Sequence, residues 1–362
     1  MSTELPTRPG LTRPGLARPG LTRLGLPLPL VQAPMAGVSG SALAIAVIEA
    51  GGLGSLPCAM LSPEQIRAEV AAIRARTRGG FNLNFFCHKP GAPDAVLEQR
   101  WRAQLGQYFE EFELDPDSVT AGGGRAPFDE SHAALVEELK PAVVSFHFGL
   151  PDESLLARVK EAGALVMSSA TTLAEARWLA AHGADVIIAQ GVEAGGHRGM
   201  FLDDNLTEQL PLLTLLPLVL AEVSVPVIAA GGMSSAPRVK AALDMGAAAV
   251  QAGSVFLLCP ECNTTPLHRS AIAASKVETV LTNVFSGKPA RAIVNRLVAE
   301  LGPICPTTPG FPHTGAALVP LRQAAEAAGR NDFSPLWCGT DPGICAEVPA
   351  GEISKRLFST GN

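Results

Sequence analysis

The segment 226–254, PVIAAGGMSSAPRVKAALDMGAAAVQAGS, holds the pattern that decides the fold. Two short apolar runs, residues 226–230 and 248–252, flank a stretch with helical periodicity. Each run ends directly in glycine, at Gly231 and at Gly253. Two buried strands joined by a helix form one unit of a parallel sheet. The segment therefore predicts a strand–helix–strand unit of an α/β protein.

The same rhythm continues toward the N-terminus, where six more apolar runs precede these two. They lie at residues 31–35, 53–56, 81–86, 143–148, 164–168 and 185–190. Most neighbouring runs are about twenty to thirty residues apart, which is the length of one strand–helix unit. Eight such units predict a (β/α)8 TIM barrel.

Other segments flank or interrupt the barrel pattern. Residues 1–29 repeat Arg-Pro-Gly-Leu and are predicted to be a disordered extension, because proline and glycine at this density build neither a helix nor a central strand. Apolar residues at helical spacing over 96–112 predict an added amphipathic helix. We expect the barrel over residues 30–260, a helical cap with helices near 268–282 and 318–328 over residues 261–330, and a closing segment over residues 331–362.

Composition excludes several classes of protein. Of 362 residues, 47% are hydrophobic and 17% charged, which is enough apolar material for a large core. The net charge of −6 lacks the basic surface that nucleic-acid binding needs. The most apolar stretch, 210–230, is interrupted by Pro217 and Glu222, so we expect a buried helix and strand there and no membrane partner. Seven cysteines without a secretory segment predict free thiols and a cytoplasmic protein.

Several common catalytic signatures are absent from the chain. It has no GxGxxG after a strand, no phosphate-binding P-loop, no HExxH and no GxSxG motif. The pair Cys259 and Cys262 has the spacing of a metal or redox site, but no second pair follows it. We therefore expect no metal.

Glycine at the ends of the last two predicted strands points to a phosphorylated ligand. Gly231 and Gly232 follow one strand, and Gly253 and Ser254 follow the other. In (β/α)8 barrels these two loops often hold a phosphate, because glycine lets backbone N–H groups approach its oxygens. A single such pair would equally well make only a tight turn.

Two histidines are candidates for chemistry. His197 lies in the glycine-rich stretch 190–199, QGVEAGGHRG, at the end of the sixth predicted strand. Imidazole is the side chain best suited to proton transfer near neutral pH, although an isolated surface histidine usually has no such role. His147 ends the fourth strand among apolar or small neighbours, which favour its neutral form. For His147, packing in the core is as good an interpretation as function.

Several segments together resemble the nitronate monooxygenases, which are FMN enzymes built on a (β/α)8 barrel. The similar segments span the chain from about residue 30 to its C-terminus, without the arginine–proline repeat. They are QAPMAG at 32–37, AGGLG at 50–54, FNLNFF at 81–86, VSFHFG at 144–149, QGVEAGGHRG at 190–199, AAGG at 229–232, QAGS at 251–254, FSGKPAR at 285–291 and PLWCG at 335–339.

This resemblance implies an oxidation of alkyl nitronates, for example propionate 3-nitronate, by molecular oxygen, giving a carbonyl compound and nitrite. It places His197 and His147 in the substrate pocket, and it allows a homodimer. The residues it implies for FMN are Pro34, Met35, Ala36, Asn84, Gln190, Gly195, Gly196, Gly231, Gly232, Gln251, Ala252, Gly253 and Ser254. Because Tyr108 is the only tyrosine, the preferred substrate size stays open.

Three alternatives remain at this point. One is an FMN-dependent reductase of the same superfamily that uses NAD(P)H to reduce a quinone or an enoyl thioester. A second is a flavin-binding barrel without turnover. A third is a barrel enzyme of phosphosugar or nucleotide metabolism, which would be colourless.

Overall fold

Eight parallel strands form a closed barrel. The computed structural model describes residues 24–89, 91, 93–116, 126–274 and 277–359. Each of the eight predicted runs overlaps one barrel strand. The strands are β1 (Leu30–Gln32), β2 (Gly54–Pro57), β3 (Phe81–Phe86), β4 (Val143–His147), β5 (Leu165–Ala170), β6 (Val186–Gln190), β8 (Val227–Ala230) and β9 (Ala249–Ala252).

The strand order β1-β9-β8-β6-β5-β4-β3-β2 leaves only the junction between β1 and β2 to be closed. There the N–H of Gln32 donates to the carbonyl of Leu53 at 2.9 Å, and the N–H of Leu53 donates to the carbonyl of Leu30 at 2.8 Å. The predicted TIM barrel is therefore confirmed.

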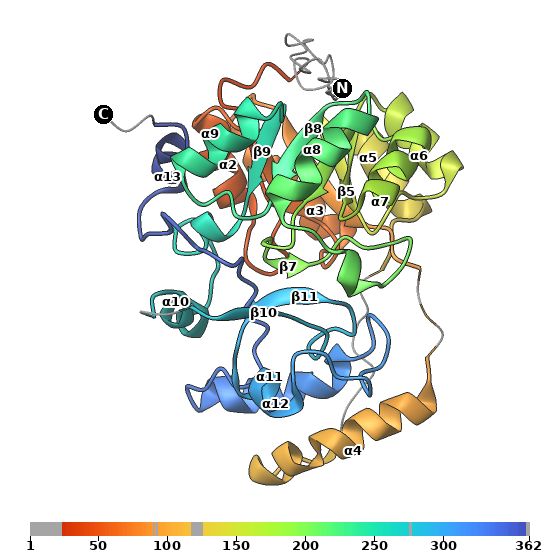
Figure 1. Ribbon diagram of the computed structural model, residues 1–362, viewed down its shortest axis with the longest axis vertical. Coiled ribbons are helices and arrows are strands. Elements are labelled where there is room, and N and C mark those ends of the chain that lie inside the picture. The colour runs from red at the N-terminus through yellow and green to blue at the C-terminus, as the bar shows by residue number, and fades with distance from the viewer. Residues whose placement is uncertain (1–23, 90, 92, 117–125, 275–276, 360–362) are drawn as a thin grey trace, which may run out of the picture.

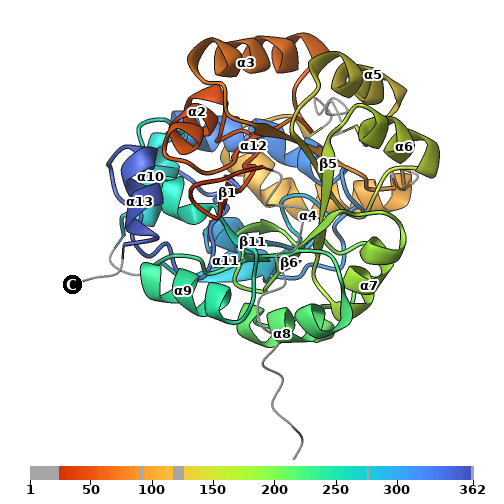
Figure 2. The same cartoon turned by 90° about the horizontal axis from the view of Figure 1, so that it is seen from above.

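Helices surround the strands, as the view from above shows (Figure 2). They are α2 (Ser41–Glu49), α3 (Pro63–Arg76), α5 (Glu130–Leu139), α6 (Glu153–Glu161), α7 (Leu173–Ala181), α8 (Leu212–Glu222), α9 (Ala236–Asp244) and α13 (Ala350–Arg356). Two short 3-10 helices are η2 (Leu206–Glu208) and η3 (Ser254–Phe256). The stretch 210–230 forms α8 and β8, as predicted. Among the described residues, no helix is both long and apolar enough to cross a membrane.

A cap lies at one end of the barrel, at the bottom of Figure 1. It contains α4 (Ala95–Glu111), α10 (Pro266–Ile272), β10 (Thr279–Thr282), β11 (Ala290–Ile293), α11 (Arg296–Leu301) and α12 (Gly315–Ala327). Strands β10 and β11 form an antiparallel sheet with β7 (Gly196–His197). The predictions of helices near 96–112 and 318–328 are confirmed.

The prediction of a helix over 268–282 is wrong beyond Ile272, and the cap is mixed rather than helical. Residues 279–282 pair antiparallel with β11 instead. Thr279, Val280 and Thr282 are β-branched, which favours a strand once a partner strand is available.

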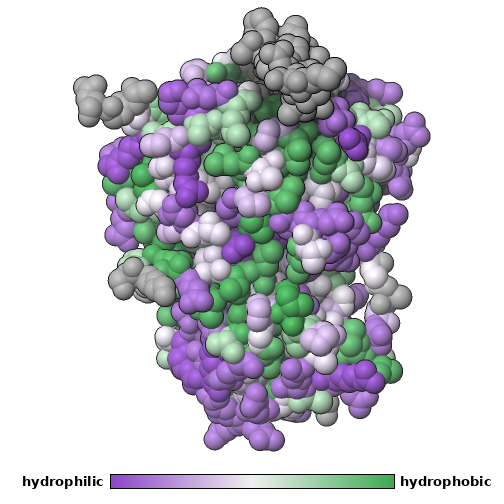
Figure 3. Space-filling view, in the orientation of Figure 1, coloured by the Kyte–Doolittle hydropathy of each residue, from purple (hydrophilic) through white to green (hydrophobic). Residues whose placement is uncertain are grey.

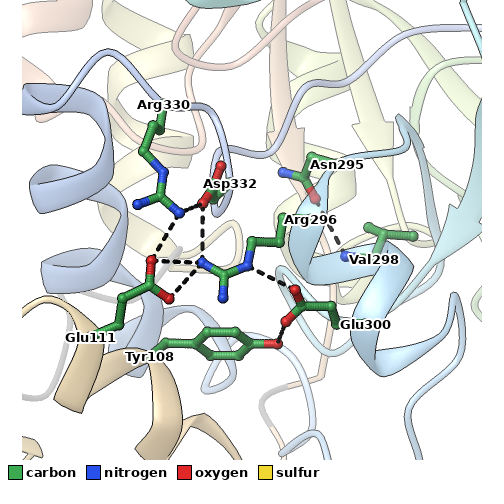
Figure 4. A network of polar contacts seen from close by, with 8 residues as sticks. All are labelled: Tyr108, Glu111, Asn295, Arg296, Val298, Glu300, Arg330 and Asp332. Carbon is green, nitrogen blue, oxygen red and sulfur yellow. Dashed lines mark hydrogen bonds and ion pairs between the residues drawn. The ribbon is translucent and has the colours of Figure 1, made fainter.

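Helix α4 belongs to the cap although its sequence lies between two barrel strands. Its predicted aromatic stripe, which includes Trp101 and Phe109, packs against Leu318 and Leu321 of α12. A network of ion pairs also joins α4 to the rest of the cap (Figure 4). In it, Arg296 pairs with Glu111 of α4 at 2.7 Å and with other acidic residues of the cap. The outer end of the cap is predominantly hydrophilic in the space-filling view (Figure 3).

The N-terminal extension is only partly within the described structure. Residues 1–23, most of the segment predicted to be disordered, lie outside the described residues. Leu24 and Leu26 pack against the apolar cluster inside the barrel that contains Val31 and Leu53. The N–H of Leu28 also donates to the carbonyl of Gly51 at 2.9 Å. The ordered body therefore begins before residue 30, where sequence analysis placed it.

Candidate active site

One pocket lies where the C-terminal ends of the barrel strands face the cap. Every residue that sequence analysis assigned to the site lines this pocket. These are Pro34, Met35, Ala36, Asn84, His147, Gln190, Gly195, Gly196, His197, Gly231, Gly232, Gln251, Ala252, Gly253 and Ser254. Segments from six strand ends, far apart in the sequence, are thus brought together, while the role of each residue stays a prediction.

His197 is presented by a strand that joins the barrel to the cap. Its backbone pairs with Ala290 of β11, and its Nε2 lies 2.9 Å from Oγ of Ser286, a buried cap residue. The Ser286 hydroxyl donates to the carbonyl of Lys288 at 3.2 Å, so its oxygen is left to accept from His197. This arrangement places a hydrogen on Nε2 of His197. Sequence analysis gave Ser286 no role.

The backbone carbonyl of His197 is held by two side chains. It accepts hydrogen bonds from Nε2 of Gln190 at 3.0 Å and from Nε2 of His147 at 3.1 Å. The other end of the Gln190 amide, Oε1, accepts from the N–H of Gly199 at 2.8 Å. Gln190 therefore holds the loop that carries His197 at two points, His197 itself and Gly199.

His147 is neutral at physiological pH. Its Nε2 donates to the carbonyl of His197, so Nδ1 is the atom that accepts from Oγ of Ser169 at 3.2 Å. Burial lowers the pKa of His147 to about 4, with Arg198 and Lys288 adding a smaller effect in the same direction. The predicted preference for the neutral form is confirmed, and its one N–H is committed to positioning the His197 loop.

Arg198 anchors the same loop from below. It is fully buried, and its guanidinium donates to the carbonyls of Gln190 at 2.7 Å and Gly191 at 2.6 Å, and to Oε1 of Gln209 at 2.8 Å. Burial lowers the pKa of Arg198 to about 9. The arginine beside His197 was visible in the sequence, but its inward direction depends on tertiary structure.

Four aromatic rings surround the imidazole of His197, and we call them the aromatic chamber. Their centroids lie 5.3 Å from it for Trp337, 5.5 Å for Phe311, 6.0 Å for Phe148 and 6.4 Å for Phe86. Phe86 and Phe148 come from the ends of β3 and β4, whereas Phe311 and Trp337 come from the C-terminal third of the chain. Phe86, Phe148 and Trp337 lie in segments quoted above, but none of the four was predicted to belong to the site.

Close backbone approaches build the opposite wall of the pocket. A Cβ added to Gly195 would lie 2.6 Å from the backbone N of Gly339. The N–H of Gly339 in turn donates to Oγ of Ser254 at 2.9 Å. Gly231 and Gly232 have φ angles of +112° and +65°, which residues other than glycine rarely adopt. These positions therefore require glycine, and we call Gly195, Gly231 and Gly232 the glycine cradle.

Polar groups in the pocket wall are consistent with a bound nucleotide. The Oε1 of Gln251 is buried and has no hydrogen-bond partner in the described structure. A ligand or a water would have to supply the N–H or O–H donor for this oxygen. The carboxylates of Glu193 and Asp341 also line the pocket. Both are engaged: Glu193 accepts from the N–H of Leu212 at 3.0 Å, and Asp341 from Oγ of Ser234 at 3.1 Å.

The cysteine pair 259 and 262 lies outside this pocket. Burial raises the pKa of Cys262 to about 12 and also raises that of Cys259, so both are held as thiols. All seven cysteines are free, as predicted. Within the described ranges, no group of three or more His, Cys, Asp or Glu side chains is arranged to hold a metal ion.

Comparisons with known proteins agree with this geometry. The family model for nitronate monooxygenase matches residues 21–359. A nitronate monooxygenase of Pseudomonas aeruginosa is 39% identical over 91% of this chain and 95% of its own length. One from Paraburkholderia phytofirmans is also 39% identical, over 91% of each chain. The crystal structure of nitroalkane oxidase from Streptomyces ansochromogenes superimposes with a TM-score of 0.84 at 38% identity, covering 93% of this chain and 96% of that one. The chain belongs to the nitronate monooxygenase family.

Proposed function

We propose that this protein oxidises alkyl nitronates with molecular oxygen at a bound FMN, releasing a carbonyl compound and nitrite. Membership of the nitronate monooxygenase family and the likeness to a nitroalkane oxidase support the reaction class. The observation that carries the proposal is the presentation of His197 into the pocket that also contains the glycine cradle. We also predict a cytoplasmic location and a homodimer.

The residues present fit FMN. The loops at Gly231–Gly232 and Gly253–Ser254 would receive the phosphate, because their backbones approach without side chains in the way. Pro34, Met35, Ala36, Asn84, Gln190, Gly195, Gly196, Gln251 and Ala252 would contact the rest of the cofactor. When bound, FMN supplies the electron acceptor that this reaction needs.

His197 would orient the substrate. A nitronate is an anion with its charge on the nitro oxygens. Because Nε2 of His197 donates to Ser286, the donor to those oxygens would be Nδ1 of the doubly protonated ring, and the charge of the anion would strengthen that hydrogen bond. His147 and Gln190 hold the backbone of His197 in place, so we assign them positioning roles. The rings of Phe86 and Trp337, which line the pocket, would cover apolar parts of the bound substrate.

Oxygen uptake and nitrite release by the FMN-loaded protein test this function. We expect both with the nitronate of a simple nitroalkane. We expect His197→Asn to retain FMN while lowering kcat by roughly a hundredfold, as is typical when a positioned hydrogen-bond donor to an anionic reacting group is removed. Rapid anaerobic bleaching of the flavin by NADH, without nitrite release from nitronates, would favour the reductase alternative instead.

A further inference from the structure

Glu175 of α7 is a charged side chain that is buried close to the candidate site. It is only 2% exposed. Its Oε2 accepts from the backbone N–H of Thr171 at 2.6 Å and from the Thr171 hydroxyl at 2.8 Å, as acidic side chains in the first turn of a helix often do. Its Oε1 accepts from the N–H of Phe201 at 2.8 Å, 26 residues away. Helix capping does not explain this last bond, because Phe201 belongs to the loop that follows His197.

A chain of hydrogen bonds joins Glu175 to Arg198, the residue after His197. The hydroxyl of Thr171, which donates to Glu175, accepts from Nε2 of Gln209 at 3.1 Å. The other end of the same amide, Oε1 of Gln209, accepts from Nε of Arg198 at 2.8 Å. Because Nε of Arg198 can only donate, the oxygen of the amide must face it. Each group in the chain therefore has a defined role as donor or acceptor.

This chain connects a buried cation with a buried anion. The three described acceptors of the Arg198 guanidinium are uncharged, since they are two carbonyls and the amide of Gln209. Burying an arginine without an opposite charge is costly. Burial and the nearby charge of Arg291 lower the pKa of Arg198, and the negative charges of Glu175 and Glu193 oppose them. Glu175 therefore helps to keep the guanidinium charged.

We propose that Glu175 and Gln209 are positioning residues for His197, a proposal that rests on the proposed function. Gln209 holds the guanidinium of Arg198, which binds the backbone at the start of the His197 loop. Glu175 holds the N–H of Phe201, which lies beyond His197. The network thus fixes the backbone on both sides of His197. Because a displacement of about 1 Å can remove much of the effect of a reacting group, these distant bonds control turnover.

Gln209→Met tests the proposal in a variant that should fold, because Gln209 is only half-buried. Methionine has a similar length but cannot bridge Arg198 and Thr171. We expect the Kd for FMN to stay within about twofold of the wild-type value, while kcat for nitronate oxidation falls about fivefold or more. An unchanged kcat, or a loss of FMN binding that accounts for the lower activity, would overturn the proposal. Absence of nitronate oxidation by the wild-type protein would instead contradict the proposed function.

Glu175→Gln tests the carboxylate, and Asp185→Asn is its matched control. Asp185 also accepts a backbone N–H, from Val166 at 2.9 Å, but it precedes β6 at the end of the barrel opposite the pocket. We expect Glu175→Gln to lower kcat about fivefold or more and Asp185→Asn to leave kcat unchanged. Equal kcat values in the two variants would overturn the role of Glu175.

A double-mutant cycle shows whether the loss acts through His197. In the background of His197→Asn, Gln209→Met and Glu175→Gln should each change kcat by less than about twofold, because the side chain that they position is no longer present. The same fold-loss of kcat with His197 and with Asn at this position would indicate general damage to the fold and would overturn the proposal.

Discussion

Replacing Gly195 by alanine should separate two loops of the predicted FMN site. The new Cβ would lie 2.6 Å from both the carbonyl carbon of Cys338 and the backbone N of Gly339, whereas ordinary contact begins at 3.4 Å. The two backbones must therefore move apart by 0.8 Å, the difference between these distances. Backbone atoms cannot rotate away as a side chain would. Overpacking of this kind costs about 1–3 kcal/mol.

The movement also reaches the predicted phosphate loop, because the N–H of Gly339 donates to Oγ of Ser254. We expect the Kd for FMN to rise at least tenfold, which corresponds to ~1.4 kcal/mol. Titration of the apoprotein with FMN, followed by flavin fluorescence, measures this Kd, and urea unfolding measures the stability.

Gly106→Ala is the matched control. Gly106 lies in α4, away from the pocket, and a Cβ there would meet nothing within 4 Å. Alanine should stabilise this helix by up to about 1 kcal/mol and leave the Kd unchanged. If Gly195→Ala bound FMN with the wild-type Kd, the glycine cradle would not be part of the FMN site.

Three further predictions concern the histidines and the N-terminus. Ser286→Ala removes the acceptor of the His197 Nε2–H and should lower kcat at least tenfold and shift the pH profile of kcat. Ser286→Thr keeps a hydroxyl and should restore kcat and its pH profile. An unchanged pH profile in the alanine variant would exclude a role of Ser286 in positioning His197. Burial lowers the pKa values of His147 and His268 to about 4 from 6.5, so the unfolded chain binds protons that the folded chain resists. The free energy of unfolding should therefore fall as the pH drops from 6.5 toward 4, by roughly 2 kcal/mol per histidine at pH 5. Urea unfolding at several pH values should show that the free energy of unfolding of His268→Gln changes less with pH than that of the wild type. An identical dependence on pH would refute the assignment to His268. Deleting residues 1–23 should leave the melting temperature unchanged, whereas deleting residues 1–28 should lower it through loss of the packed Leu24 and Leu26, and equal melting temperatures would contradict that packing.

The barrel could be predicted from sequence because its determinants are local. Each strand is a short apolar run, and runs such as 226–230 end in glycine where the pocket begins. The strand β10 could not be predicted in the same way. Its residues become a strand because β11 lies beside them, and that pairing is a tertiary contact.

The site was predictable in the same unequal way. His197 and the glycines stand at strand ends, where barrels place ligands, so position along the chain was informative. The aromatic chamber has no local pattern, because Phe86, Phe148, Phe311 and Trp337 come from separate segments that only the folded barrel and the C-terminal part of the chain bring together. The inward direction of Arg198 was equally invisible in the sequence.

Identification of the flavin in the purified protein tests the central claim most directly. We expect a yellow protein that releases stoichiometric FMN when it is denatured. A colourless protein that retained no FMN after incubation with an excess and gel filtration would contradict it.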